Sequence, residues 1–264
     1  MTNEFNVLPR SRMFELYSFL NKENQPAFKA VAVREIDIAK IEEIRSRTSH
    51  REKRPTYTSF VAKAAAQALM EIPEANRVAM RSLFAYRLIQ FNKAHISIAV
   101  ERDDADRNLK AAFIYTIYDT ASKSLVEISK EINGLATAAL DSDDIRLERW
   151  RRIKRGVKWV PLWLIKLAIF CHRHVPSLYI QNRGGAVLIS SPSKYGVDFI
   201  VAQWPYPIGL SFGFAKDRPW VKGDRVVIKK TMTITMAFDR RILPGGPASR
   251  FMNRVCEILE NDDD

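Results

Sequence analysis

The sequence predicts an α/β or α+β protein in which helices and strands interleave and the C-terminal half is mostly β-structure. Three segments carry the apolar stripe of an amphipathic helix, at residues 59–72, at 124–132 and from 247 onward. Runs rich in β-branched and aromatic residues alternate with them, at 95–100, 111–118, 186–190, 210–214 and 226–238. The 264 residues show no internal repeat and suit one large domain better than two small ones.

Each expected helix has a recognisable start. Thr58 or Ser59 can cap the first helix. The second begins with a capping box, in which Ser124 and Glu127 satisfy each other's backbone amides. The third opens at Pro247, a favourable residue for a first turn. The faces expected to be buried are Val61, Ala65, Leu69 and Ile72; Leu125, Ile128 and Ile132; and Phe251, Val255, Ile258 and Leu259.

Composition excludes several classes of protein. A hydrophobic content of 47% rules out disordered, collagen-like and low-complexity chains. Two cysteines, Cys171 and Cys256, are too few for a disulfide framework or a cysteine-rich zinc module, and they fit a reducing compartment. The N-terminus lacks the apolar core of a secretory signal. We therefore expect a cytoplasmic protein.

Positive charge is concentrated in one segment. The chain has 42 Lys and Arg against 30 Asp and Glu, a net charge of +12. The 38 residues from Arg146 to Arg183 contain ten of these basic side chains and one acid, Glu148, and so carry +9 of the net charge. They read as a basic helix, RLERWRRIKRGVK, followed by an apolar one, WVPLWLIKLAIFCH.

Three interpretations of this segment stay open. Basic residues beside Trp and Leu suit a helix lying on an anionic membrane surface, here Arg146–His174. A helical hairpin whose apolar side packs on its own domain is favoured over it, because apolar runs more often indicate burial. Nucleic acid is a third partner for a positive patch, although no nucleic-acid-binding motif accompanies it. The apolar stretch Trp159–Cys171 contains Lys166 and is shorter than the roughly 18 residues that cross a bilayer.

Few residues match a known catalytic motif. Residues 209–213 match the G-x-S-x-G nucleophile elbow at Ser211, but FAKDRPW after it reads as a strand end and loop, not the required helix. His172 and His174 have no third metal ligand nearby. His95 starts a strand, a position that favours packing over catalysis. The absence of Walker A, G-x-G-x-x-G and H-E-x-x-H motifs leaves nucleotide hydrolysis, dinucleotide redox chemistry and zinc proteolysis without support.

In order along the chain, the segments resemble the catalytic domain of the dihydrolipoyl acyltransferases of 2-oxo-acid dehydrogenase complexes, related in fold to chloramphenicol acetyltransferase. The resemblance rests on LPRSRM at 8–13, AVAVREIDIAKIEEIR at 30–45, GGAVLISS at 184–191 and AFDRRILPGGPASRFMNRVCEILE at 237–260, among others. It implies one domain over residues 1–264 with the coenzyme A-dependent acyltransferase fold, a two-layer α/β sandwich with a mixed sheet. Residues 141–182 look like an inserted basic helical segment.

The resemblance also assigns a site and a departure from it. In the family, a histidine in the pattern His-Arg-x-x-Asp-Gly takes the proton from the attacking thiol or hydroxyl, and an earlier serine stabilises the oxyanion. By position, Ser190 matches the serine and Arg241 matches the arginine. Arg240, directly after Asp239, stands at the histidine position, and Pro244 stands at the position of the acid. A guanidinium with a pKa above about 12 cannot accept a proton, and proline has no side-chain acceptor. The resemblance thus implies that the inherited mechanism cannot run unchanged.

Ligands and partners follow from the same resemblance. The fold typically forms trimers with the active site between subunits and a channel for coenzyme A. We therefore expect a homotrimer that binds coenzyme A or another acyl thioester, and no metal. The family's proteins carry lipoyl domains ahead of the catalytic domain, whereas this chain begins close to it, so a stand-alone protein without a lipoyl domain is expected.

Two functions stay open at this point. The first is an acyltransferase with an altered mechanism, in which Ser190 donates to the oxyanion and Arg240 anchors a carboxylate or phosphate. Its base would be the substrate itself or a histidine of a neighbouring subunit, His95, His172 or His174. The second is a catalytically inactive relative that serves as a trimeric scaffold or ligand-binding protein.

Overall fold

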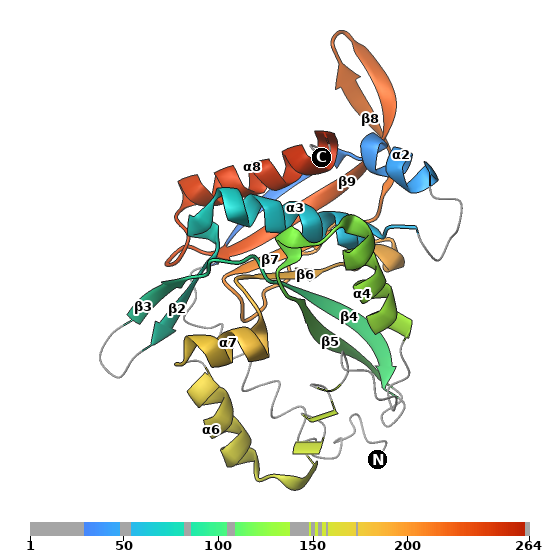
Figure 1. The fold of residues 1–264 in the computed structure, drawn as a ribbon. Helices are drawn as coiled ribbons and strands as arrows, with labels where there is room; N and C mark the ends of the chain where they lie inside the picture. Colours follow the sequence, from blue (N-terminus) through green and yellow to red (C-terminus); the bar gives the residue numbers. More distant parts are fainter. Residues whose placement is uncertain are drawn as a thin grey trace, which may run out of the picture.

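A seven-stranded mixed sheet forms the centre of the molecule (Figure 1). The computed structural model describes residues 29–47, 54–81, 86–104, 109–137, 148, 151–152, 155–156, 158–172 and 174–261. The strands of the sheet are β1 (Lys29–Asp37), β4 (Ile96–Asp104), β5 (Leu109–Ile117), β6 (Val187–Ser190), β7 (Ile208–Phe212), β8 (Lys216–Lys222) and β9 (Arg225–Asp239). Their order is β1-β9-β7-β6-β4-β5, with β8 paired to the first part of β9. β6 runs parallel to both of its neighbours, and every other pair is antiparallel.

Helices cover one face of this sheet (Figure 1). They are α2 (Ala39–Arg47), α3 (Tyr57–Glu71), α4 (Leu125–Thr137) and α8 (Gly245–Asn261). The apolar residues of the strands, such as Ile98, Ile189, Leu210 and Ile234, point toward these helices and form the main core with them. The predicted two-layer α/β sandwich with a mixed sheet is therefore confirmed.

A smaller cluster lies beside the main core. It joins a hairpin, β2 (Arg77–Arg81) and β3 (Tyr86–Gln90), to helix α7 (Pro176–Arg183) through Val78, Met80, Phe91, Tyr179 and Ala186. Helix α6 (Leu162–His172) precedes α7 and lies away from the sheet (Figure 1). The predicted basic helix before α6 falls mostly outside the described residues.

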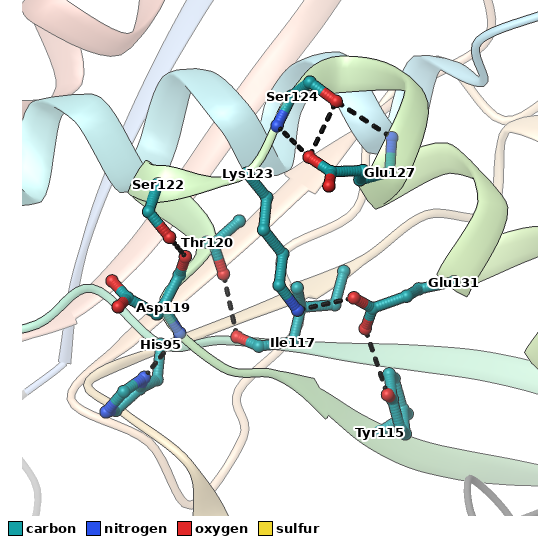
Figure 2. A network of polar contacts seen from close by, with 10 residues as sticks. All are labelled: His95, Tyr115, Ile117, Asp119, Thr120, Ser122, Lys123, Ser124, Glu127 and Glu131. Atoms are coloured by element: carbon teal, nitrogen blue, oxygen red, sulfur yellow. Dashed lines mark hydrogen bonds and ion pairs between the residues drawn. The ribbon is translucent and has the colours of Figure 1, made fainter.

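The first predicted helix cap is wrong, and the second is confirmed. Thr56, not Thr58 or Ser59, caps α3: its Oγ1 accepts a hydrogen bond from the backbone N of Ser59 at 3.1 Å. Thr56 has an extended backbone, with φ −84° and ψ 154°, so helical geometry begins only after it. At α4 the capping box forms as predicted, because the backbone N of Ser124 donates to Glu127 at 2.8 Å and that of Glu127 donates to Ser124 at 3.3 Å (Figure 2).

The last helix begins earlier than predicted. α8 starts at Gly245, and Pro247 lies within its first turn. The carbonyl oxygen of Pro244 accepts the first helical hydrogen bond, from the backbone N of Ala248 at 3.0 Å. Proline is tolerated there because a first turn leaves its backbone amides without helical partners. The predicted buried face is confirmed at Phe251, Val255, Ile258 and Leu259.

The G-x-S-x-G pattern lies on strand β7 and serves packing. Ser211 is a buried strand residue, and no helix follows it. Most of residues 214–220, predicted as a strand end and loop, instead belong to the edge strand β8 (Lys216–Lys222), where Pro219 does not interrupt a central ladder. A Cβ on Gly213 would lie 1.7 Å from the carbonyl oxygen of Asp198. The glycine thus lets the chain after β6 pass in close contact with the residues that follow β7.

We expect Gly213→Ala to lower the free energy of unfolding by about 1–3 kcal/mol, because the backbone at Asp198 must move to admit a methyl group. Urea unfolding measures the change. Gly246→Ala is the matched control: its nearest neighbour is the Arg250 side chain at 3.9 Å, and the change should be under about 1 kcal/mol. Equal losses in the two variants would contradict the packing role of Gly213.

Candidate functional site

Ser190 ends β6 at the mouth of a cavity. The cavity has a volume of about 570 Å³, and Ser190 is half-buried in its wall. Its lining combines apolar and polar residues, among them Ile98, Ile132, Ile189, Ser191, Ser193, Glu101, Lys194 and Tyr195. The cavity can therefore hold an apolar chain with its reactive end near the Ser190 hydroxyl.

Hydrogen bonds fix the turn that follows Ser190. The Ser191 hydroxyl donates to the carbonyl oxygen of Phe212 at 2.7 Å and accepts from the backbone N of Ser193 at 3.1 Å. Lys194 pairs with Glu101 at 2.7 Å, and the Tyr195 hydroxyl donates to the same carboxylate at 2.6 Å. These contacts tie the turn to β4 and β7, so Ser190 is held on a rigid element.

A second cavity adjoins the first and is positively charged. Its volume is about 510 Å³, and it shares Thr58 and Ser193 with the Ser190 cavity. Arg45 and Arg54 line it. The Arg45 guanidinium donates to the carbonyl oxygen of Pro55 at 2.8 Å, and the buried Nε of Arg54 hydrogen-bonds to no described residue. Arg45 also pairs with Glu42 through Nε at 3.3 Å. Two guanidinium groups in one lining favour a ligand with an anionic group.

A row of hydroxyl groups crosses the sheet beside Ser190. In register, Ser190 lies next to Ser211, and Ser211 next to Thr235. Thr235 donates to the carbonyl oxygen of Ile200 at 2.6 Å. The Ser211 hydroxyl is buried and makes no hydrogen bond to any described residue. The sequence singled out Ser211 only through the wrong motif, because its neighbours on the sheet come from distant segments.

The other predicted site residues gather where β9 ends. Asp239 is 3% exposed and accepts hydrogen bonds from Arg241, from the backbone N at 3.0 Å and from Nη2 at 2.6 Å. Burial alone would raise the pKa of Asp239, but the hydrogen bonds and charge of Arg241 outweigh it and hold the pKa below its usual value. Arg241 is therefore committed to Asp239, whereas Arg240 is exposed.

Lys29 joins this end of the sheet, and sequence reasoning missed it. Strand pairing brings Lys29 opposite Asp239, although 210 positions separate them along the chain. Its Nζ donates to the carbonyl oxygen of Tyr206 at 2.5 Å. Burial lowers the pKa of Lys29, against the opposing charge of Asp239. Only the β1–β9 pairing reveals this contact.

Within one chain, Ser190 and Arg240 lie toward opposite ends of the strands of the sheet. Ser190 is level with Thr235, whereas Asp239 lies four residues farther along β9. At roughly 3.3 Å per residue this is about 13 Å along the strand, in addition to the two strand spacings between β6 and β9. A single subunit therefore does not bring the two predicted groups together.

The predicted histidines have other contacts. His95 is 8% exposed, and its Nδ1 accepts a hydrogen bond from the backbone N of Asp119 at 2.9 Å (Figure 2). His174 Nδ1 lies 2.6 Å from the carbonyl oxygen of Phe170. The side chain of His172 lies outside the described residues. In the described part of the chain, no three His, Cys, Asp or Glu residues converge as metal ligands, and no histidine lines either cavity.

We expect acid to destabilise the fold through His95. Burial lowers the pKa of His95 below 6.5, with Asp119 opposing and Lys93 assisting the shift. The unfolded chain therefore binds a proton at a higher pH than the folded one, so stability falls as the pH drops below about 6.5, down to the lowered pKa. In His95→Asn, which keeps a hydrogen-bond acceptor, the free energy of unfolding measured with urea should depend less steeply on pH across this range. An unchanged slope would contradict the assignment.

A comparison with protein families places these features in context. The model for 2-oxoacid dehydrogenases acyltransferase (catalytic domain) matches residues 16–146 and 179–264. The acetyltransferase component of the pyruvate dehydrogenase complex of Rickettsia prowazekii is 24% identical over 206 residues, covering 76% of this chain and 40% of that protein. The chain thus spans about 40% of the length of this curated relative.

Solved structures share the fold. Dihydrolipoamide acetyltransferase from Azotobacter vinelandii, studied for the role of a serine, a histidine and an asparagine in its catalytic mechanism, has a TM-score of 0.71 at 19% identity, covering 99% of this chain and 93% of that one. Chloramphenicol acetyltransferase has a TM-score of 0.51 at 11% identity, covering 98% and 100%. The resemblance predicted from the sequence is confirmed at the level of family and fold.

Proposed function

Because this chain belongs to the family of 2-oxoacid dehydrogenase acyltransferase catalytic domains, we propose that it binds an acyl thioester of coenzyme A and transfers the acyl group to a thiol. The observation that carries the proposal is the pair of adjoining cavities, with Ser190 in one and Arg45 and Arg54 in the other. Coenzyme A has a long flexible arm that ends in a thiol at one end and in phosphates at the other. Guanidinium groups bind phosphates well, and an apolar wall suits the acyl chain.

A complete site needs more than one subunit. Ser190 and Arg240 lie toward opposite ends of the strands in one chain, so a neighbouring copy must bring its Arg240 end to the Ser190 cavity. The expected homotrimer with sites between subunits meets this requirement. Val31 and Val33, 45% and 53% exposed on the sheet face away from the helices, give such a contact an apolar surface.

Arg240 has an electrostatic role in this proposal. Its guanidinium cannot accept a proton, but a fixed positive charge lowers the pKa of a nearby thiol and so raises the thiolate fraction at neutral pH. Asp239 does not cancel this charge, because that carboxylate is bound to Arg241. An acceptor that arrives as a thiolate needs no general base.

The reaction then balances without proton transfer. The acceptor thiolate attacks the thioester carbonyl carbon, and a new C–S bond forms. The Ser190 hydroxyl donates to the oxyanion of the tetrahedral intermediate. Collapse of the intermediate breaks the C–S bond to coenzyme A, which leaves as a thiolate. One thiolate is consumed and one is formed. Turnover is therefore compatible with arginine at position 240 for a thiol acceptor, but not for an alcohol, which needs a general base.

Binding without turnover is the second candidate function. It is favoured by the absence of histidine and cysteine from the described linings of both cavities. Under this alternative, the trimer serves as a scaffold or a coenzyme A-binding protein. Calorimetry with coenzyme A and an assay of thioester turnover separate the two, because only the acyltransferase releases product.

We expect Ser190→Ala to lower kcat for acyl-coenzyme A and a small thiol acceptor at least about tenfold, with little change in KM, because the lost hydrogen bond forms only in the transition state. Release of the coenzyme A thiol reports the rate. Ser122→Ala, an exposed serine outside the lining of both cavities, is the matched control. Wild-type protein that binds coenzyme A without turnover would instead establish the second function.

We expect the rate to rise with pH through the lowered pKa of the acceptor thiol. In Arg240→Ala this rise should move toward the ordinary thiol value of about 8.5, with at least about a tenfold lower rate at pH 7. Arg240→Lys should keep most of the effect, and Arg225→Ala, exposed on the β8–β9 hairpin, should behave as wild type. A pH profile unchanged in Arg240→Ala would overturn this role.

A further inference from the structure

Helix α6 is apolar on both of its sides. Leu162, Ile165 and Ile169 are partly buried on the inner side. The outer side carries Trp163, Leu164, Leu167 and Phe170, which are 65%, 38%, 50% and 51% exposed. Trp159, just before the helix, is 76% exposed. A helix in water ordinarily places polar residues on its exposed side, so this arrangement indicates that something covers it.

The described elements of the fold do not cover this side. The main packing partner of α6 is α7, and both lie away from the helices that cover the sheet (Figure 1). Of the three interpretations left open by the sequence, packing on its own domain accounts for the inner side only. The outer side forms a continuous apolar stripe, because residues 163, 167 and 170 recur at helical spacing.

Positive charge stands next to this stripe. The 13 residues from 146 to 158 contain seven Lys and Arg and one acid, Glu148. Among the described ones, Arg151, Arg152, Arg155 and Lys158 lie in helical conformation shortly before α6. Exposed tryptophans beside basic side chains match the boundary between lipid headgroups and acyl chains.

We propose that α6 and the basic residues before it dock on an anionic lipid surface. The helix has 11 residues and is about 16 Å long, whereas the hydrocarbon core is about 30 Å thick. No helix in the described ranges has the length and apolar character to cross a membrane. The helix therefore lies in the plane of the surface, with its outer side toward the acyl chains and its basic flank toward the headgroups.

Charge favours lipid over a second copy of the chain as the occupant. A contact between two α6 helices would bring together two segments that each carry +9 over residues 146–183. Like charges at that density repel unless anions lie between them. Anionic headgroups supply opposite charge and an apolar phase at the same time.

Co-sedimentation of the full chain with vesicles tests the proposal. Vesicles of phosphatidylcholine with about one quarter phosphatidylglycerol should bind the chain at least about tenfold more tightly than pure phosphatidylcholine, and about 0.5 M salt should remove most of the difference. The fluorescence of the exposed Trp159 and Trp163 should shift to shorter wavelength on binding. Equal binding to both vesicle types, or none to either, would overturn the proposal.

Two sets of variants identify the surface. Trp159→Ser with Trp163→Ser and Leu164→Ser should reduce vesicle binding at least about tenfold. Val226→Ser with Ile228→Ser removes side chains that are 70% and 80% exposed on the β8–β9 hairpin, and should leave binding unchanged. Arg155→Glu with Lys158→Glu should weaken binding to anionic vesicles without altering the apolar side of α6. This variant tests the contribution of positive charge to binding even if the first variant fails to fold.

Analytical ultracentrifugation without lipid tests whether a second copy of the chain, instead of lipid, covers the outer side of α6. Loss of oligomers in the Trp159, Trp163 and Leu164 variant, together with undiminished vesicle binding, would assign the outer side of α6 to a second copy and overturn the proposal. An unchanged oligomeric state with lost vesicle binding would support lipid docking.

Discussion

The antiparallel run of β9 between β1 and β7 fixes where every group of the candidate site can lie. Each of these strands has one register, because a one-residue shift would turn the core residues Met232, Ile234 and Met236 away from the helices. With that register set, the C-terminal end of β6 and the C-terminal end of β9 must point to opposite ends of the sheet. The separation of Ser190 from Arg240 is thus a consequence of core packing, and a site that uses both has to form between subunits.

The same register explains how a permanently charged residue can stay available. Asp239 ends β9 in a buried position beside Lys29, where its carboxylate needs partners. Arg241 supplies them through backbone and side chain, while the turn directs Arg240 outward. Charge at this end of the sheet therefore consists of the Asp239–Arg241 ion pair, Lys29 and the exposed Arg240 guanidinium, which cannot accept a proton.

Helix α6 poses a different physical problem from the rest of the fold. In the main core, apolar residues of the sheet and of the covering helices pack against each other. In α6 apolar residues lie on both sides of the helix, and the described part of the fold packs against only one of them. Lipid docking would add a second function to an acyltransferase fold without altering its sheet, because the helix lies outside the two layers (Figure 1).

The amino-acid sequence by itself determined the class of fold, the positions of the main strands and helices, and the family. These depend on local periodicity, on caps such as Ser124 and Glu127, and on the order of segments along the chain. Only the tertiary structure decided which groups meet: Lys29 with Asp239, Ser190 with Ser211, and the two cavities with each other. The capping of α3 by Thr56 and the strand formed by residues 216–222 were also decided there. Such contacts depend on hydrogen bonds and packing between residues far apart in the chain, which leave no mark in local patterns.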